Sequence, residues 1–198
     1  GGSGADSILF KDSVTTDGVI LTNSGNDSVR FNENANVNTI DFGAGNDILI
    51  ADKILEKNGV TSISGGAGKD TFSINTLRNV NIQAGAGVDS VNIFGSLLGS
   101  TVDFGAGDEN FTQSVNSSAS TVAGGAGNDT MLFNTAAKVT AGKIDGGAGN
   151  DSITLNLAIT SGSVIGGSGE DSITLVNDFV SGYASGDAGT DLLIFSST

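Results

Sequence analysis

Short segments in which apolar and polar residues alternate recur along the chain about every twenty residues. Ser152–Leu155 reads SITL, and Ser172–Leu175 repeats it, so each segment places two apolar side chains on one face. Alternation of apolar and polar residues at every second position is typical of a strand that is buried on one side. The first apolar place is filled in ten such segments, by Ile8, Val29, Leu49, Phe72, Val91, Phe111, Met131, Ile153, Ile173 and Leu193.

A second apolar column lies further along each unit, beyond a polar loop that absorbs differences in length. It consists of Ile20, Ile40, Ile63, Ile82, Val102, Val122, Ile144, Val164 and Ala184. One unit cannot bury its own apolar face, whereas stacked copies bury a continuous one. The pattern therefore predicts an all-β, parallel solenoid of ten coils of about 20 residues, forming a single domain over residues 1–198. At about 4.8 Å per coil, the rod would be about 45 Å long.

A glycine-rich turn precedes the first strand of every unit. The turns begin at Gly1, Thr22, Phe42, Gly65, Ala84, Phe104, Gly124, Gly146, Gly166 and Gly186. They follow the pattern GG-x-G-x-D, in which the fourth residue is always Gly. The sixth residue is always acidic: Asp6, Asp27, Asp47, Asp70, Asp89, Glu109, Asp129, Asp151, Asp171 and Asp191. Turn chemistry alone explains the glycines, but it does not explain an acid at one fixed offset.

Composition narrows the functional classes. The formal net charge is −14, with an isoelectric point near 4.1, which argues against binding to nucleic acid or to anionic membranes. The chain has no His and no Cys, which excludes a Ser-His-Asp triad, a histidine zinc site, disulfides and thiolate metal sites. We expect no enzymatic activity, because the acidic residues outside the sixth turn position form no converging set.

The acidic column predicts a cation site. Stacking places the ten carboxylates in a file at about 4.8 Å, where bare neighbours repel one another. Carboxylate and carbonyl oxygens are the ligands of Ca²⁺, whereas Mg²⁺ usually keeps its waters. Because carbonyls along an extended turn alternate in direction, positions one and three should face one neighbouring coil and positions two and four the other. Each acid should then bridge two gaps, together with turn carbonyls such as those of Gly125, Gly127, Gly147, Gly149, Gly167 and Gly169.

The segments GGAGNDTML at Gly124, GGAGNDSIT at Gly146 and GGSGEDSIT at Gly166 resemble the nonapeptide of RTX (repeats-in-toxin, haemolysin-type) calcium-binding proteins. The resemblance implies a right-handed β-roll with Ca²⁺ between turns, in a bacterial protein exported to the medium or the cell surface by a type I system. Only one turn per coil carries the motif here, so we expect one file of up to nine Ca²⁺. The weakest sites should lie at Glu109 and at the turns containing Asn23 and Asp187.

Three functions stay open. The first is a structural segment of an S-layer protein or a large RTX adhesin, which folds and self-associates on binding calcium outside the cell. The second is a ligand-binding module for ice or a polysaccharide, which a regular outward Thr file would favour; the glycine turns of this chain carry no such file. The third is the non-catalytic tail of a secreted enzyme. In each case we expect the chain to be a fragment of a larger protein that contacts neighbouring domains or copies of itself.

Overall fold

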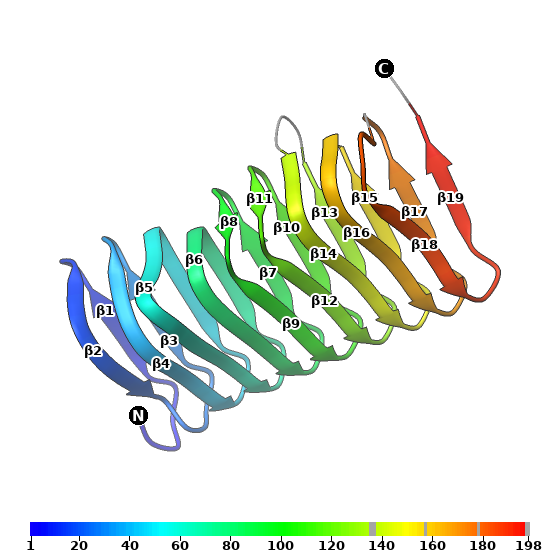
Figure 1. Cartoon of the computed structure of the whole chain (residues 1–198). Coiled ribbons are helices and arrows are strands. Elements are labelled where there is room, and N and C mark those ends of the chain that lie inside the picture. The colour runs from blue at the N-terminus through cyan, green and yellow to red at the C-terminus, as the bar shows by residue number, and fades with distance from the viewer. Residues whose placement is uncertain (135–137, 157, 178, 197–198) are drawn as a thin grey trace.

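The protein is an all-β, parallel solenoid in which the coils stack into a rod with the two termini at opposite ends (Figure 1). The computed structural model describes residues 1–134, 138–156, 158–177 and 179–196, without the side chains of residues 16, 57–60 and 138. Every paired strand in this part of the chain runs parallel to its neighbours. The predicted fold class is therefore confirmed.

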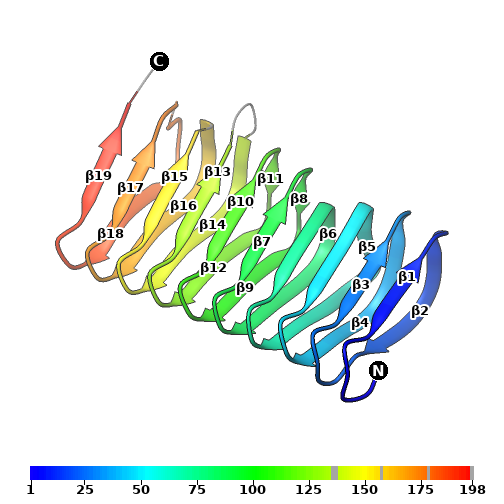
Figure 2. The same ribbon diagram turned by 180° about the vertical axis from the view of Figure 1, so that it is seen from behind.

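Two sheets face each other across the core. The first sheet (in front in Figure 2) consists of β1 (Ser7–Phe10), β3 (Ser28–Phe31), the starts of β5 (Ile48–Ala67) and β6 (Thr71–Ala86), β7 (Ser90–Ile93), β10 (Asn110–Gln113), β13 (Thr130–Phe133), β15 (Ser152–Leu155), β17 (Ser172–Leu175) and β19 (Leu192–Phe195). The second sheet consists of β2 (Val14–Leu21), β4 (Ala35–Ala44), the ends of β5 and β6, β9 (Thr101–Ala106), β12 (Thr121–Ala126), β14 (Lys138–Ala148), β16 (Ala158–Ser168) and β18 (Tyr183–Ala188). Their side chains meet in one continuous apolar core.

Both apolar columns run in register through the core. Ile153 pairs with Met131 on one side and with Ile173 on the other, and Ile144 pairs with Val122 and Val164 in the same way. Strands of the first sheet alternate between exposed and buried side chains, as in β15. The two columns predicted from the sequence are thus confirmed.

A third buried column, which the sequence analysis did not identify, lies where the two sheets join away from the glycine turns. It consists of Ala35, Leu55, Leu77, Leu97, Ser117, Val139 and Ile159. We call this side of the rod the opposite edge. It includes β8 (Leu97–Leu98), β11 (Ser117–Ser118), the middle parts of β5 and β6, and the starts of β4, β14 and β16.

The side that carries the glycine turns, along the bottom of Figure 1, is called the turn edge below. Its turns align coil by coil, and Gly125 and Ala126 pair with Gly147 and Ala148 of the next coil. Shifts in register occur elsewhere, for example between Glu56 and Thr61 of β5. The expectation that length differences fall outside the glycine turns is therefore confirmed. In β5 and β6, however, strand and loop merge into continuous strands of 20 and 16 residues.

Candidate metal centre

Backbone conformation explains why the second and fourth turn positions are glycine. Gly147 and Gly149 have φ of 112° and 129°, which side chains rarely tolerate. Asn23 and Asp187 replace glycine at the second position with φ of 74° and 68°. Asn and Asp are the non-glycine residues that adopt this conformation most readily. The two exceptions in the sequence therefore preserve the shape of the turn.

Turn carbonyls alternate in direction between the two neighbouring coils. The third-position carbonyl of Ser168 accepts a hydrogen bond from Gly149 N–H of the preceding coil at 2.8 Å. The carbonyl oxygens of Gly125, Gly127, Gly147, Gly149 and Gly169 instead lie closer than 3.0 Å to the place where a Cβ on the equivalent glycine of the following coil would stand. These carbonyls, proposed as ligands from the sequence, thus face the following coil, whereas the first-position carbonyls lie beside the acidic side chains.

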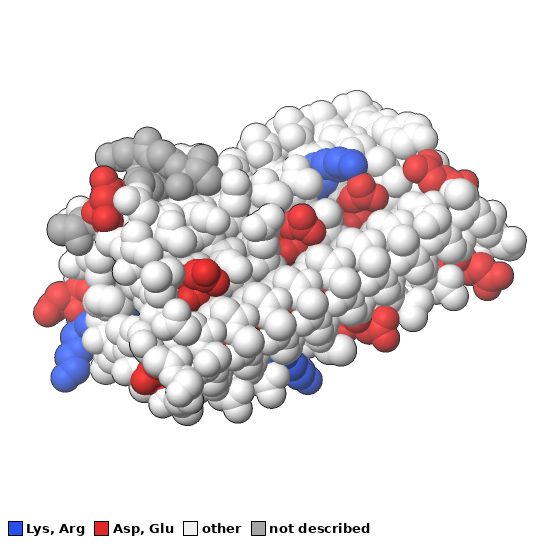
Figure 3. All heavy atoms as spheres, turned by 90° about the horizontal axis from the view of Figure 1, so that it is seen from below, with Lys and Arg blue, Asp and Glu red and all other residues white. Residues whose placement is uncertain are grey.

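The acidic side chains form a file inside the rod. Asp27, Asp47, Asp70, Asp89, Glu109, Asp129, Asp151 and Asp171 are at most 3% exposed, and Asp6 and Asp191 in the terminal coils are partly buried. Viewed from below, the turn edge is a ridge of uncharged atoms, with exposed acids lying to its sides (Figure 3). The file that the sequence predicted is present, but it lies beneath the turns and away from solvent.

One oxygen of each aspartate joins the file to the backbone. Asp151 Oδ1 accepts a hydrogen bond from Asp129 N–H at 2.8 Å, and Asp171 Oδ1 accepts one from Asp151 N–H at 2.8 Å. In six further pairs the backbone N–H of the first residue donates to Oδ1 of the second: Asp6 and Asp27, Asp27 and Asp47, Asp47 and Asp70, Asp70 and Asp89, Glu109 and Asp129, and Asp171 and Asp191. Each aspartate that accepts such a bond therefore holds two coils in register. The ladder is interrupted between Asp89 and Glu109, where the longer side chain of Glu109 approaches Gly107.

The other carboxylate oxygen has no partner. Within the described residues, Oδ2 of Asp27, Asp47, Asp70, Asp89, Asp129, Asp151 and Asp171 is buried without a hydrogen bond, as are both carboxylate oxygens of Glu109. A buried, unpaired carboxylate oxygen costs free energy unless a cation or a proton compensates for it.

In five gaps the Oδ2 atom of the aspartate faces a backbone carbonyl oxygen of the next coil; of these five oxygens, that of Asp6 also accepts a hydrogen bond from Gly2 N–H at 3.0 Å. A Cβ placed on Gly146 would come closer than 3.0 Å to both Asp151 Oδ2 and the carbonyl oxygen of Gly166. The pairs at the other four gaps are Asp6 with Thr22, Asp70 with Ala84, Asp129 with Gly146 and Asp171 with Gly186. Two acceptors that converge in this way need a positive group between them. This observation fits a calcium site, since both oxygens are of the type that Ca²⁺ binds.

Burial changes the protonation of the file. Desolvation raises the pKa of Asp70 and that of Asp151 to about 6, and repulsion from neighbouring acids adds to this rise. The pKa of Glu109 rises to about 9, first through desolvation and then through contact with Asp129. Desolvation also raises the pKa values of Asp47, Asp89, Asp129 and Asp171. Without a cation, the folded rod therefore holds protons that an exposed acid would release.

Each gap holds few acidic groups, so a cation would rely mainly on the backbone. No group of three or more acidic residues converges within the described part of the chain. The ion pairs in the described part of the chain join Arg30 to Asp52, Arg78 to Glu56 and Lys143 to Asp145, and all three lie outside the file. Sequence reasoning did not recognise the importance of the first turn position, although its mixture of Gly, Thr, Ala and Phe was visible.

Comparison with protein-family models, curated proteins and solved structures gives no match to this chain. Across the described ranges, no helix has the length and apolar character needed to cross a membrane. Fold and candidate site together define a parallel β-solenoid with a buried carboxylate file along its turn edge.

Proposed function

We propose that the chain is a structural, calcium-binding β-solenoid of the RTX type from a secreted or cell-surface bacterial protein, such as an S-layer protein or a large adhesin. The observation that carries this proposal is the convergence of a buried carboxylate oxygen and a carbonyl oxygen, as at Asp151 and Gly166. A bound Ca²⁺ supplies positive charge to these oxygens. The chain's own residues also hold neighbouring coils together, because aspartates such as Asp151 and Asp171 accept a hydrogen bond from the preceding coil through Oδ1.

Calcium binding should be coupled to folding. The site exists only when two coils are stacked, so the free energy of binding adds directly to that of folding. Outside the cell, where calcium is abundant, the solenoid would be stable, and before export it would stay largely unfolded. Bound Ca²⁺ would also neutralise much of the net charge of −14, which weakens repulsion between rods and permits self-association.

Circular dichroism with and without calcium tests this proposal. At physiological temperature and neutral pH we expect little β-structure in a calcium-free buffer, because the chain melts below that temperature, and addition of millimolar Ca²⁺ should restore the β-structure by raising the melting temperature. Mg²⁺ at the same concentration serves as the control and should have a much smaller effect. An unchanged spectrum and melting temperature in both buffers would contradict the proposal. Light scattering across the same calcium range tests self-association separately.

One observation favours a ligand-binding module as the second candidate. The outward positions of the first sheet carry small hydroxyl and amide side chains from β6 to β17. One file consists of Thr71, Ser90, Asn110, Thr130, Ser152 and Ser172, and beside it lie Ser73, Asn92, Thr112, Thr154 and Thr174, with Leu132 interrupting this second file between Thr112 and Thr154. All are at least partly exposed, and none is charged. Ice recrystallisation and polysaccharide pull-down assays on Thr154→Leu, compared with the parent chain, would test this face.

A further inference from the structure

The first residue of each turn divides the gaps between coils into two kinds. Gly1, Gly65, Gly124, Gly146 and Gly166 each precede a further coil and have no side chain at this point. Thr22, Phe42, Ala84 and Phe104 occupy the same position in the other four turns that precede a further coil. These four residues are buried, so their side chains point into the rod and not into solvent.

A side chain at this position and a converging oxygen pair exclude each other. At each of the five glycines, an added Cβ would lie within 3.0 Å of both the carboxylate oxygen and the carbonyl oxygen. Real Cβ atoms essentially never come that close to another heavy atom. In the turns that begin with Thr22, Phe42, Ala84 or Phe104, the two oxygens therefore cannot converge in the same way.

Thr22 shows what a side chain does instead. Its hydroxyl donates a hydrogen bond of 3.0 Å to the carbonyl oxygen of Phe42, the first residue of the next turn. The equivalent carbonyl at Gly166 faces Asp151 Oδ2. At Thr22 the protein itself thus supplies a donor to the carbonyl of the next turn.

We infer that the first turn residue decides which gaps hold a calcium ion. The ions occupy the five gaps that follow Gly1, Gly65, Gly124, Gly146 and Gly166, not all nine. Three of these gaps are consecutive and lie in the C-terminal half of the rod. This inference rests on the proposed function in taking calcium as the cation, and it adds where the ions bind and how many there are.

Calcium stoichiometry tests the inference. The calcium-stripped chain is titrated with Ca²⁺ alone, and bound metal per chain is measured by equilibrium dialysis with atomic absorption. We expect about five ions at saturation. Nine ions would overturn the inference and leave the proposed function standing, whereas no bound calcium would overturn both.

Two substitutions change the count in opposite directions. Gly146→Ala places a Cβ between the two oxygens and should lower the count by one, since Gly146 has no positive φ that would forbid alanine. Ala148→Ser is the matched control in the same turn, with the residue found at the equivalent Ser168, and should leave the count unchanged. Ala84→Gly opens the gap beside Asp89 and should raise the count by one. If Gly146→Ala does not fold, Ala84→Gly decides, and an unchanged count there would overturn the inference.

Discussion

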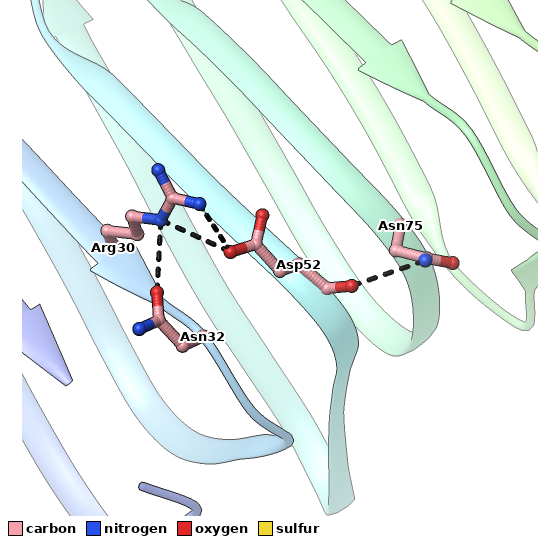
Figure 4. A network of polar contacts seen from close by, with 4 residues as sticks. All are labelled: Arg30, Asn32, Asp52 and Asn75. Carbon is pink, nitrogen blue, oxygen red and sulfur yellow. Dashed lines mark hydrogen bonds and ion pairs between the residues drawn. The ribbon is translucent and has the colours of Figure 1, made fainter. Parts of the chain in front are cut away.

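The two edges of the solenoid treat acidic side chains in opposite ways. On the turn edge, acids such as Asp151 are buried and keep one oxygen without a partner. Toward the opposite edge, where β5 leaves the first sheet, the side chain of Asp52 is 37% exposed and lies 2.7 Å from Arg30 (Figure 4). Asn75 of β6 also donates a hydrogen bond to the backbone carbonyl of Asp52 at 3.3 Å. The protein supplies a cationic partner, Arg30, to Asp52 but none to Asp151.

This difference explains why one edge is uniform and the other varies. On the turn edge, each carboxylate must reach the N–H of the preceding coil, so an inserted residue would break the ladder. The opposite edge is held by apolar packing and exposed ion pairs, which tolerate shifts such as that between Ala51 and Ile54. Exposed ion pairs contribute little to stability, so their loss costs little.

The largest expected effect that separates the edges is the pH dependence of the calcium-free chain. Asp70 and Asp151 have pKa values of about 6 in the folded chain, above the ordinary value of 3.8, so the folded state binds protons more tightly. Protonation therefore stabilises the fold, and this stability is complete below pH 3.8 and is lost as pH rises through about 6. The raised pKa of Glu109 extends the loss toward pH 9.

Thermal melts in calcium-free buffer measure this effect. Between pH 5 and pH 8 we expect the melting temperature to fall by on the order of 10 °C, since each unit of pKa shift is worth about 1.4 kcal/mol. With saturating calcium the fall should shrink or reverse, because protons and Ca²⁺ compete for the same oxygens. A calcium-free chain that is more stable at pH 8 than at pH 5 would contradict the burial of the file.

A smaller effect is expected from changing one carboxylate of the file. Asp151→Asn keeps an oxygen for Asp129 N–H and can place an amide donor opposite the Gly166 carbonyl. Without calcium this variant should therefore melt a few degrees higher than the parent chain, and with calcium it should melt lower. Asp151→Ala leaves Asp129 N–H buried without an acceptor, which should cost about 1–3 kcal/mol without calcium. With calcium the cost should be larger, because the cation site loses its carboxylate as well.

The comparison between the two variants is read from their melting curves at neutral pH. Equal melting points of Asp151→Asn and Asp151→Ala would mean that neither the acceptor for Asp129 N–H nor a donor opposite the Gly166 carbonyl matters. A lower melting point for Asp151→Asn in calcium-free buffer would likewise refute the unpaired-anion interpretation.

Much of the fold follows from the sequence because its period is short and its columns are strict. The columns through Ile153 and Ile144 could be placed correctly, since burial requires one residue type at one offset in every coil. The acid file could be placed for the same reason. Turn exceptions were harder to interpret, and the positive φ of Asn23 and Asp187 shows that they preserve the turn.

Other features depend on side-chain direction, which a one-dimensional pattern does not specify. Nothing in the sequence shows that Asp151 Oδ1 binds a backbone N–H while Oδ2 stays free. The third column was missed because it falls in segments of unequal length, where Ser117 takes the place of an apolar residue. Like Ser117, Gln113 is a polar residue buried in an otherwise apolar column, and its Nε2 donates a hydrogen bond to the Asn116 carbonyl.

The smallest effect is expected on the opposite edge, where the acids already have partners. Asp52→Asn removes the charge that faces Arg30, but both side chains are exposed and water replaces the lost contact. We expect a loss of about 0.5 kcal/mol or less, weaker still at high salt, with no change in the calcium count. Urea denaturation of this variant beside Asp151→Asn makes the comparison directly, because the two substitutions are chemically identical. If Asp52→Asn altered calcium dependence as much as Asp151→Asn, the file on the turn edge would not be the place where the cation acts.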